Sequence, residues 1–114
     1  MMKYASASLL FLLAIGAQAA SAQQANLTPQ QIHGRQIVTQ NCVVCHMPSD
    51  PGAKTYGPPL NKAAANGDDQ LMHQVIQNGL VLMPGWKYTL SNSDIDDVVA
   101  FLKTVPVSPA PASR

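Results

Sequence analysis

This sequence has little cysteine and no glutamate: its 114 residues include only two cysteines. Without a second cysteine pair, the sequence lacks the roughly four ligands of a zinc site. Strand-like alternation of apolar and polar residues is also absent, which argues against the βαβ context of a thioredoxin-like redox motif. In residues 23–114, six aspartates balance six lysines and arginines, so no basic stripe indicates nucleic-acid binding.

The first 22 residues have the pattern of a secretory signal peptide. Lys3 gives a positive start, an apolar run follows over residues 9–15, and residues 20–22 fit the small-x-small rule for cleavage. Cleavage after Ala19 is an alternative, because residues 17–19 fit the same rule. The apolar run falls short of the ~20 residues of a membrane helix. We therefore expect residues 1–22 to direct export to the periplasm, with no stable membrane insertion after cleavage.

The two cysteines lie in the segment Cys42-Val43-Val44-Cys45-His46. Residues at i, i+3 and i+4 share one face of a helical turn, so both thiols and the imidazole point to one side. This pattern is typical of covalent haem c attachment, in which the thiols form thioethers with two vinyl groups and the histidine becomes the proximal iron ligand. A disulfide here would close a very short loop and stabilise little, but disulfide or thiol chemistry stays open from these residues alone.

The three expected main helices can be located from sequence signals at their ends. Thr28 and Gln31 form a capping box, with a proline at the first helical position, and this helix should run to about Asn41. A second helix is expected over residues 68–78, where apolar residues recur at helical spacing. Gly79 is a normal residue for its C-terminal end.

The third main helix is expected after Ser91, with Asp94 at the capping-box position and Pro106 at its end. Residues 62–65 are compatible with a short helical turn. Residues 107–114 are rich in proline, alanine and serine, and we expect them to form a flexible tail. The chain is thus predicted to be all-α.

A haem iron with a proximal histidine has a second axial position, and the candidates for it are Met47, Met72, Met83, His33 and His73. Met47 adjoins the proximal histidine and cannot reach the opposite face, and Met72 belongs to an apolar helical stripe. We expect His33 and His73 to be solvated. Met83 lies in an apolar loop beside a stiffening proline. Since Met/His ligation is an electron-transfer arrangement, Met83 is the expected ligand, with simple packing as its alternative role.

With these residues assembled, residues 27–105 resemble a class I monohaem c-type cytochrome. The Cys42–His46 motif carries the resemblance most strongly. Residues 57–60, Gly-Pro-Pro-Leu, are similar to the Gly-Pro-x-Leu segment of that family, and Met83-Pro84 is similar to its distal loop. The resemblance implies a cytochrome c fold over residues 23–106, with three main helices and loops around one covalently attached haem c.

The resemblance also implies roles for single residues. The carbonyl of Pro58 would accept a hydrogen bond from Nδ1 of His46 and so orient the iron ligand. Gly34 on the first helix would meet Phe101 on the last. The iron ligands would be His46 and Met83, and the full set of haem-binding residues would be Cys42, Cys45, His46, Pro58 and Met83.

These features predict a periplasmic one-electron carrier that is not an enzyme. Its partners would be redox proteins, a donor dehydrogenase or an acceptor oxidase or cytochrome. Lys54, Lys62 and Lys87 lie in segments expected to ring the haem, where they could steer a partner or simply be solvated. The alternative function is a cytochrome c subunit of a periplasmic dehydrogenase complex. A gas-binding or catalytic haem protein is disfavoured by Met83 and by the lack of a distal histidine or arginine suited to oxygen or peroxide chemistry.

Overall fold

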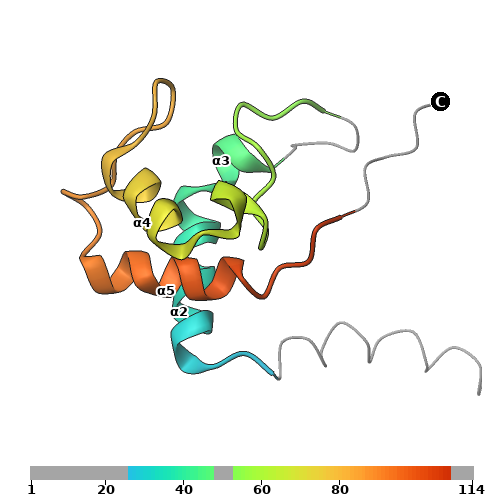
Figure 1. Cartoon of the computed structure of the whole chain (residues 1–114), viewed down its shortest axis with the longest axis vertical. Helices are drawn as coiled ribbons and strands as arrows, with labels where there is room; N and C mark the ends of the chain where they lie inside the picture. The colour runs from blue at the N-terminus through green and yellow to red at the C-terminus, as the bar shows by residue number, and fades with distance from the viewer. Residues whose placement is uncertain (1–25, 48–52, 109–114) are drawn as a thin grey trace, which may run out of the picture.

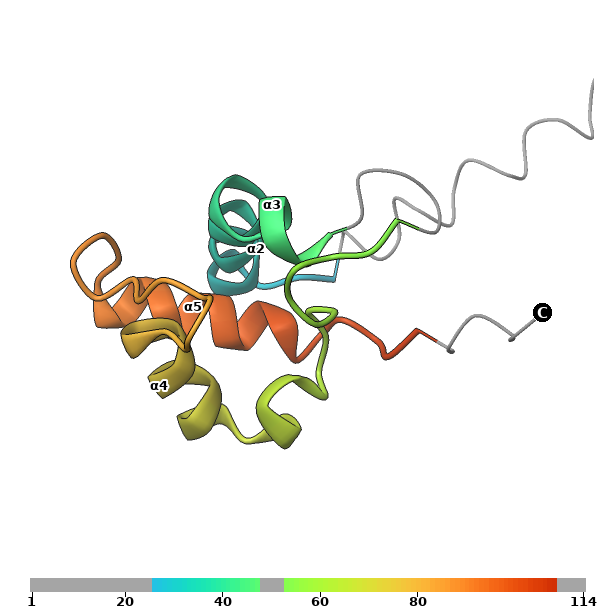
Figure 2. The ribbon, with the colours of Figure 1, turned by 90° about the horizontal axis from the view of Figure 1, so that it is seen from above.

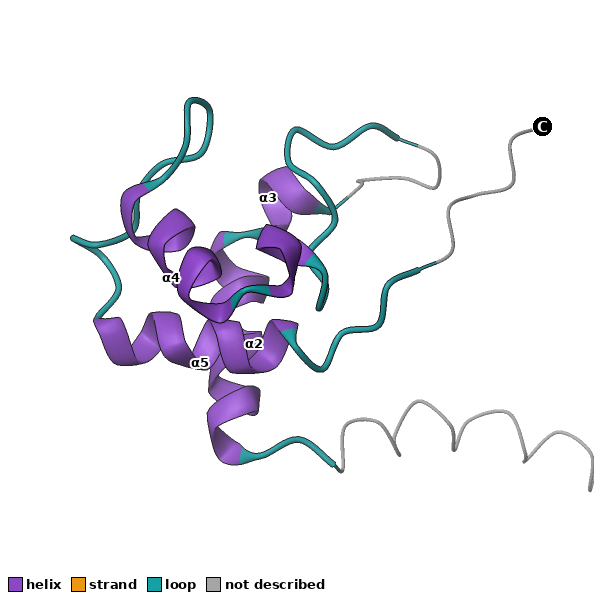
Figure 3. Cartoon of the chain, viewed as in Figure 1, coloured by secondary structure: helices purple, strands orange, loops and turns teal. Residues whose placement is uncertain are grey.

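The computed structural model describes residues 26–47 and 53–108, and within these ranges the chain forms helices and loops but no strand (Figure 3). This confirms the expected all-α fold. The signal peptide expected over residues 1–22 and the end of the expected tail, residues 109–114, lie outside the described residues. In chain order the helices are α2 (Pro29–Asn41), α3 (Val43–His46), the 3₁₀ helix η1 (Ala64–Gly67), α4 (Asp69–Asn78) and α5 (Asn92–Leu102) (Figure 1).

The two predicted capping boxes are both formed. At the start of α2, the Gln31 amide donates to Oγ1 of Thr28 over 3.2 Å, and the Thr28 amide donates to Oε1 of Gln31 over 2.9 Å. At the start of α5, the Asp94 amide donates to Oγ of Ser91 over 3.1 Å, and the Ser91 amide donates to Oδ2 of Asp94 over 2.9 Å. Each box satisfies two amides that the first helical turn leaves without partners.

The core forms where α5 lies between α2 and α4 (Figure 2). The α2 helix approaches α5 closely because Gly34 has no side chain: a Cβ there would lie 1.9 Å from the carbonyl oxygen of Asp97 and 2.9 Å from the Val98 nitrogen. A Cβ at Gly34 would thus meet the backbone of α5 one turn before Phe101. The buried side chains of the described part are apolar: Ile37, Val38, Met72, Ile76, Ile95, Val98, Val99 and Leu102.

Two boundaries differ from the sequence prediction. The short turn expected over residues 62–65 is instead η1, and its Ala65 and Asn66 have positive φ angles of 49° and 59°. The last helix ends at Leu102, before the proline that was expected to end it. There the Thr104 amide donates to the Phe101 carbonyl over 2.8 Å, so a tight turn replaces the last helical turn.

The helices of residues 26–47 and 53–108 are too short or too polar for any of them to cross a membrane. The expected signal segment lies outside these ranges.

Candidate haem site

The attachment motif begins one residue after α2 ends. Cys42 has φ −105° and ψ −30°, which keeps the backbone close to helical between α2 and α3. The amides of Cys45 and His46 both donate to the Cys42 carbonyl, over 3.2 Å and 3.1 Å. The two cysteines and the histidine therefore lie on one turn, where i, i+3 and i+4 side chains share a face.

Both thiols are available on this turn. Cys42 and Cys45 are free cysteines, each half-buried. Burial, and to a lesser degree the neighbouring Cys45, raises the pKa of the Cys42 thiol above its ordinary value. Cys42 is therefore an uncharged thiol near neutral pH, packed against the edge of the apolar core.

His46 is oriented by the segment that starts at Gly57. Its Nδ1 lies 2.7 Å from the carbonyl oxygen of Pro58, and the Gly57 amide donates to the Cys45 carbonyl over 2.8 Å. A Cβ on Gly57 would lie 2.4 Å from Cε1 and 2.5 Å from Nδ1 of His46, so no side chain fits there. With Nδ1 directed at a carbonyl, the neutral ring carries its proton on Nδ1, and the lone pair of Nε2 is left for a metal.

Met83 lies in the loop between α4 and α5. Its side chain is half-buried and packs against the core. The Leu80 amide donates to the Met83 carbonyl over 3.0 Å, and the Met83 amide donates back to the Leu80 carbonyl over 3.1 Å. This pair of bonds makes a tight turn over residues 80–83 and leaves the thioether on a braced backbone.

Exposed apolar side chains gather in the segments around these candidate ligands. Of the large hydrophobic residues exposed in the described part, seven lie between residues 44 and 56 or between residues 80 and 88: Val44, Met47, Tyr56, Leu80, Val81, Leu82 and Tyr88. Such side chains can contribute to a place that binds an apolar partner or ligand. A flat apolar macrocycle with iron, thiol-reactive vinyl groups and two open axial positions fits this set of donors and this surface.

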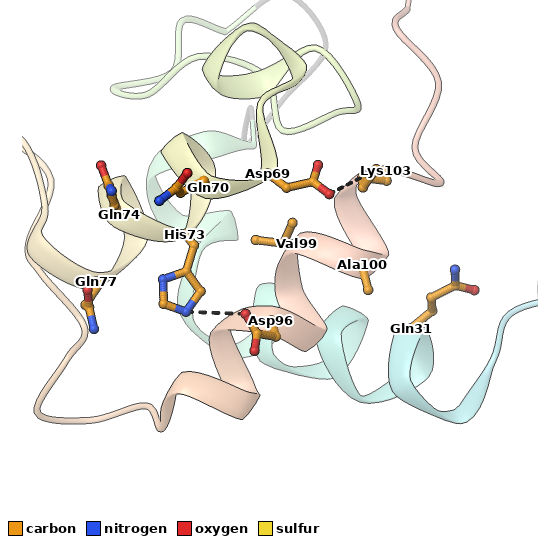
Figure 4. Close-up of a pocket in the computed structure, with 10 residues that line it drawn as sticks. All are labelled: Gln31, Asp69, Gln70, His73, Gln74, Gln77, Asp96, Val99, Ala100 and Lys103. Carbon is orange, nitrogen blue, oxygen red and sulfur yellow. Dashed lines mark hydrogen bonds and ion pairs between the residues drawn. The ribbon is translucent and has the colours of Figure 1, made fainter.

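A separate groove lies between α4 and α5, with a volume of about 830 Å³ (Figure 4). Its lining includes none of the five predicted haem residues and no sulfur-containing side chain. Two ion pairs lie along it: Nε2 of His73 is 3.4 Å from Oδ1 of Asp96, and Nζ of Lys103 is 2.6 Å from Oδ2 of Asp69. This polar groove is not the haem site.

The other histidines differ in part from their predicted environments. His33 is exposed, as expected, but its Nδ1 lies 2.8 Å from Oδ2 of Asp97 on α5. His73 was expected to be solvated, and this was wrong: its side chain is only 22% exposed and pairs with Asp96. Helical spacing places His73 off the centre of its apolar stripe but cannot show that the first turns of α5 cover it. Within the described residues, no group of three or more His, Cys, Asp or Glu side chains is arranged to hold a metal ion.

The sequence interpretation missed three glycines that shape the site. Gly57 was part of a recognised segment but was given no role, and Gly79 was considered only as a helix end. Gly85 was given no role either. A glycine close to a candidate ligand can be noticed in the sequence. Its role cannot, because the atoms that leave no room for a side chain there come from other parts of the fold.

Comparisons with known proteins identify the family of the chain. The family model for cytochrome c oxidase, cbb3-type, subunit III matches residues 29–102. The chain is 34% identical over 76 residues to cytochrome c6 of Synechocystis, covering 61% of this chain and 61% of that protein. It is 30% identical over 83 residues to the cytochrome c subunit of alcohol dehydrogenase (quinone) from Gluconobacter oxydans, covering 61% of this chain and 17% of that protein. The chain thus spans less than two thirds of the length of either curated relative.

A solved structure supports the same fold. Cytochrome c6 from the diatom Phaeodactylum tricornutum aligns with a TM-score of 0.51 and 25% sequence identity, over 63% of this chain and 88% of that one. The family model covers most of the chain, and the helical architecture agrees with that neighbour. The chain therefore belongs to the family of cytochrome c oxidase, cbb3-type, subunit III, and is a small class I c-type cytochrome with the cytochrome c fold and a covalently bound haem c.

Proposed function

We propose that this protein is a one-electron carrier in which Cys42 and Cys45 hold the haem and His46 and Met83 ligate its iron. The observation that supports this most is that both candidate axial ligands are held in place, the His46 ring by its 2.7 Å contact with the Pro58 carbonyl and the Met83 backbone by its turn with Leu80. A haem iron with two protein ligands takes up and releases one electron as it cycles between the ferric and ferrous states.

The cysteines supply the covalent attachment. Each thiol adds across one vinyl group: its sulfur forms a C–S bond with one vinyl carbon, and its proton is transferred to the other. Because Cys42 and Cys45 lie on one helical turn, both bonds are made from a single short segment. The half-buried position of Cys42 against the core then ties the attachment to α2.

His46 acts as a neutral ligand with a fixed ring. Its Nδ1–H donates to the Pro58 carbonyl, which makes Nε2 more basic and keeps the ring from rotating. Gly57 allows the two segments to approach closely enough for this hydrogen bond. The ring therefore has little freedom to reorient when the charge on the iron changes.

Met83 supplies a soft thioether, which favours the ferrous state and raises the reduction potential. With both axial positions filled by side chains, no position remains for oxygen or peroxide. This supports a carrier over a catalytic or gas-binding protein.

Carbon monoxide tests the ligation, because it binds a ferrous haem only where an axial position is open. The visible spectrum of the ferrous holoprotein should not change on addition of carbon monoxide, whereas that of Met83→Ala should. The matched control is Met72→Leu, a conservative change at a buried methionine of α4 that is 3% exposed and was not chosen as ligand, and it should behave like the unsubstituted protein. A carbon monoxide shift in the unsubstituted protein would remove Met83 from its role.

The alternative is a cytochrome subunit bound to a periplasmic dehydrogenase. It is favoured by the similarity to a dehydrogenase cytochrome c subunit and by the exposed apolar side chains between residues 44 and 56 and between residues 80 and 88. A free carrier purifies as a single small chain, whereas a subunit co-purifies with a larger dehydrogenase in fixed stoichiometry. Size-exclusion chromatography of the native protein from its own cells distinguishes the two.

We also propose export to the periplasm, because residues 1–22 have a signal-peptide pattern. The redox partners then belong to that compartment, and Lys54, Lys62 and Lys87 are available to steer an acidic one. Cell fractionation followed by intact-mass measurement would test this. The expected product begins at Gln23 and carries one haem; a full-length, cytoplasmic chain would contradict the proposal.

A further inference from the structure

The loop that carries Met83 is tied to the last turn of α4 at both of its ends. The Gly79 amide donates to the Val75 carbonyl over 2.8 Å, the usual bond at a helix end. Further along, the Trp86 amide donates to the Ile76 carbonyl over 3.0 Å and the Lys87 amide to the Gln77 carbonyl over 3.2 Å. Helices leave their last carbonyls without internal partners. Here two backbone amides at the returning end of the loop donate to two of these carbonyls.

Gly79 begins the loop in a conformation that other residues avoid. Its φ is 77° and its ψ is −179°, a region that essentially only glycine occupies. A Cβ there would also lie 2.3 Å from the carbonyl oxygen of Met83. Any side chain at Gly79 would therefore displace the backbone of the proposed ligand itself.

Gly85 closes the loop from the other side. A Cβ at Gly85 would lie 2.7 Å from both the carbonyl carbon and the carbonyl oxygen of Asn78, and 2.9 Å from the carbonyl oxygen of Gln77. Gly85 is not among the glycines with positive φ, so its requirement is close approach alone. Two glycines thus lie at the base of one loop. Gly79 is required by its backbone conformation and by its close contact with Met83, and Gly85 is required only by its close contact with the end of α4.

We propose that Gly79 and Gly85 are positioning residues for the Met83 thioether, because they close the base of the loop on α4 and so fix where Met83 stands. This inference rests on Met83 as the iron ligand, proposed above. A methyl group at either glycine forces the loop away from the end of α4. Met83 moves with the loop, and the second axial position opens while the attachment at Cys42 and Cys45 is unchanged.

The test compares holoproteins carrying Gly79→Ala, Gly85→Ala and the control Gly67→Ala. Gly67 also has a positive φ, 73°, but lies in η1, where a Cβ would meet only the Lys62 carbonyl at 3.4 Å. The control therefore introduces a methyl group at another positive-φ glycine, away from the loop. Two readouts apply to each protein: binding of carbon monoxide to the ferrous form, and the fluorescence of Trp86, the only tryptophan, which a nearby haem quenches.

The expected result is that both loop variants bind carbon monoxide stoichiometrically and fluoresce more strongly, whereas Gly67→Ala and the unsubstituted protein do neither. Carbon monoxide binding by the unsubstituted protein would contradict the proposed ligation. If the unsubstituted protein is inert and both loop variants are inert too, the positioning role is wrong and the ligation stands.

Equal opening in Gly67→Ala would also overturn the positioning role, since it would reflect general destabilisation. Should Gly79→Ala not accumulate with haem, Gly85→Ala decides the matter alone, and an inert Gly85→Ala protein overturns the inference.

Discussion

At the residue scale, the haem site depends on missing side chains as much as on ligands. His46 keeps its orientation because Gly57 lets the Pro58 carbonyl come within 2.7 Å of Nδ1. The hydrogen bond makes the imidazole a stronger electron donor, which stabilises the ferric state. A change at Gly57 should therefore be visible in the reduction potential even though the residue touches no iron.

Gly57→Ala should raise the reduction potential. The added Cβ would lie 2.4 Å from the imidazole ring, so the hydrogen bond to Pro58 lengthens or breaks and the ligand becomes a weaker donor. The shift equals the difference in hydrogen-bond energy between the ferric and ferrous states, and since the whole bond is worth roughly 1 kcal/mol, the shift should be at most about 40 mV in a one-electron couple. Potentiometric titration measures the shift, with Gly67→Ala as the control. An unchanged potential in a correctly attached Gly57→Ala protein would show that the bond does not tune the iron.

The candidate ligands and the contact between His46 and Pro58 could be predicted from the sequence, whereas the glycines that make room around them could not. Cys42, Cys45 and His46 are recognisable because their spacing on one turn is a local property. The roles of Gly57, Gly79 and Gly85 depend on which atoms approach them through the tertiary fold. Sequence distance carries no information about such contacts, so these roles became visible only from the structure.

At the scale of elements, α5 is the helix on which the others assemble. It lies between α2 and α4 (Figure 2), and its early turns carry Asp94, Asp96 and Asp97, which pair with His33 from α2 and His73 from α4. The helix boundaries that agree best with the sequence are those set by capping boxes, since a cap is defined by residues three positions apart. The bounds of η1 differ from the predicted turn over residues 62–65, because the left-handed backbone at Ala65 and Asn66 has no comparable signal in the sequence.

Gly34→Ala should destabilise the protein, although alanine is the better helix former. The gain in helix propensity is about 1 kcal/mol. Against it, the new Cβ would lie 1.9 Å from the Asp97 carbonyl, and overpacking of this kind costs about 1–3 kcal/mol. Guanidinium unfolding should therefore show a lower midpoint for Gly34→Ala, with little change for Gln36→Ala on the exposed face of α2. A higher midpoint would mean that α2 and α5 can separate at little cost.

The capping box of α5 should make stability depend on acidic pH. The pKa of Asp94 is lowered by the side-chain hydrogen bond from Ser91, then by the Ser91 backbone amide, and by the charge of His33. The Asp94 carboxylate therefore contributes fully to the free energy of unfolding above its unfolded-state pKa of about 3.9. This contribution is lost as the pH falls through the lower pKa of the folded state.

Asp94→Asn should therefore remove a part of the acid destabilisation. Urea unfolding of both proteins between about pH 2.5 and pH 6 measures it, and the difference in stability between them should shrink as the pH falls below about 4. The capping box of α2 provides a control, because Gln31 is uncharged and the effect of Gln31→Ala should not vary over this range. A constant difference between Asp94→Asn and the unsubstituted protein would contradict the assignment.

At the scale of the whole molecule, the apolar core among the helices is small and the apolar surface around the haem site is large. Eight side chains are buried in the core cluster, whereas Val81, Leu82 and Tyr56 are 100%, 89% and 90% exposed. Small domains often need a covalent or bound group to complete their folding. The haem is thus expected to act as part of the core as well as the redox centre.

A chain that cannot attach haem, Cys42→Ala with Cys45→Ala, should lose cooperative tertiary structure. We expect residual helical circular dichroism, a broad thermal transition and strong binding of the dye ANS, which reports exposed apolar surface. The matched comparison is the holoprotein under the same conditions. A sharp unfolding transition at the holoprotein's midpoint would mean that the helices are stable without the haem.

The single-residue joint between α2 and α3 has a consequence for the order of maturation. Every backbone hydrogen bond within the attachment turn joins residues at most four positions apart, so the turn can form as soon as that stretch of chain is available. Pro58, whose carbonyl contacts His46, is made later, as are Met83 and α5, and contacts between segments this far apart in the sequence form more slowly. Covalent capture of the cofactor can therefore come first, and the remaining two thirds of the domain can then fold around a group that is already in place.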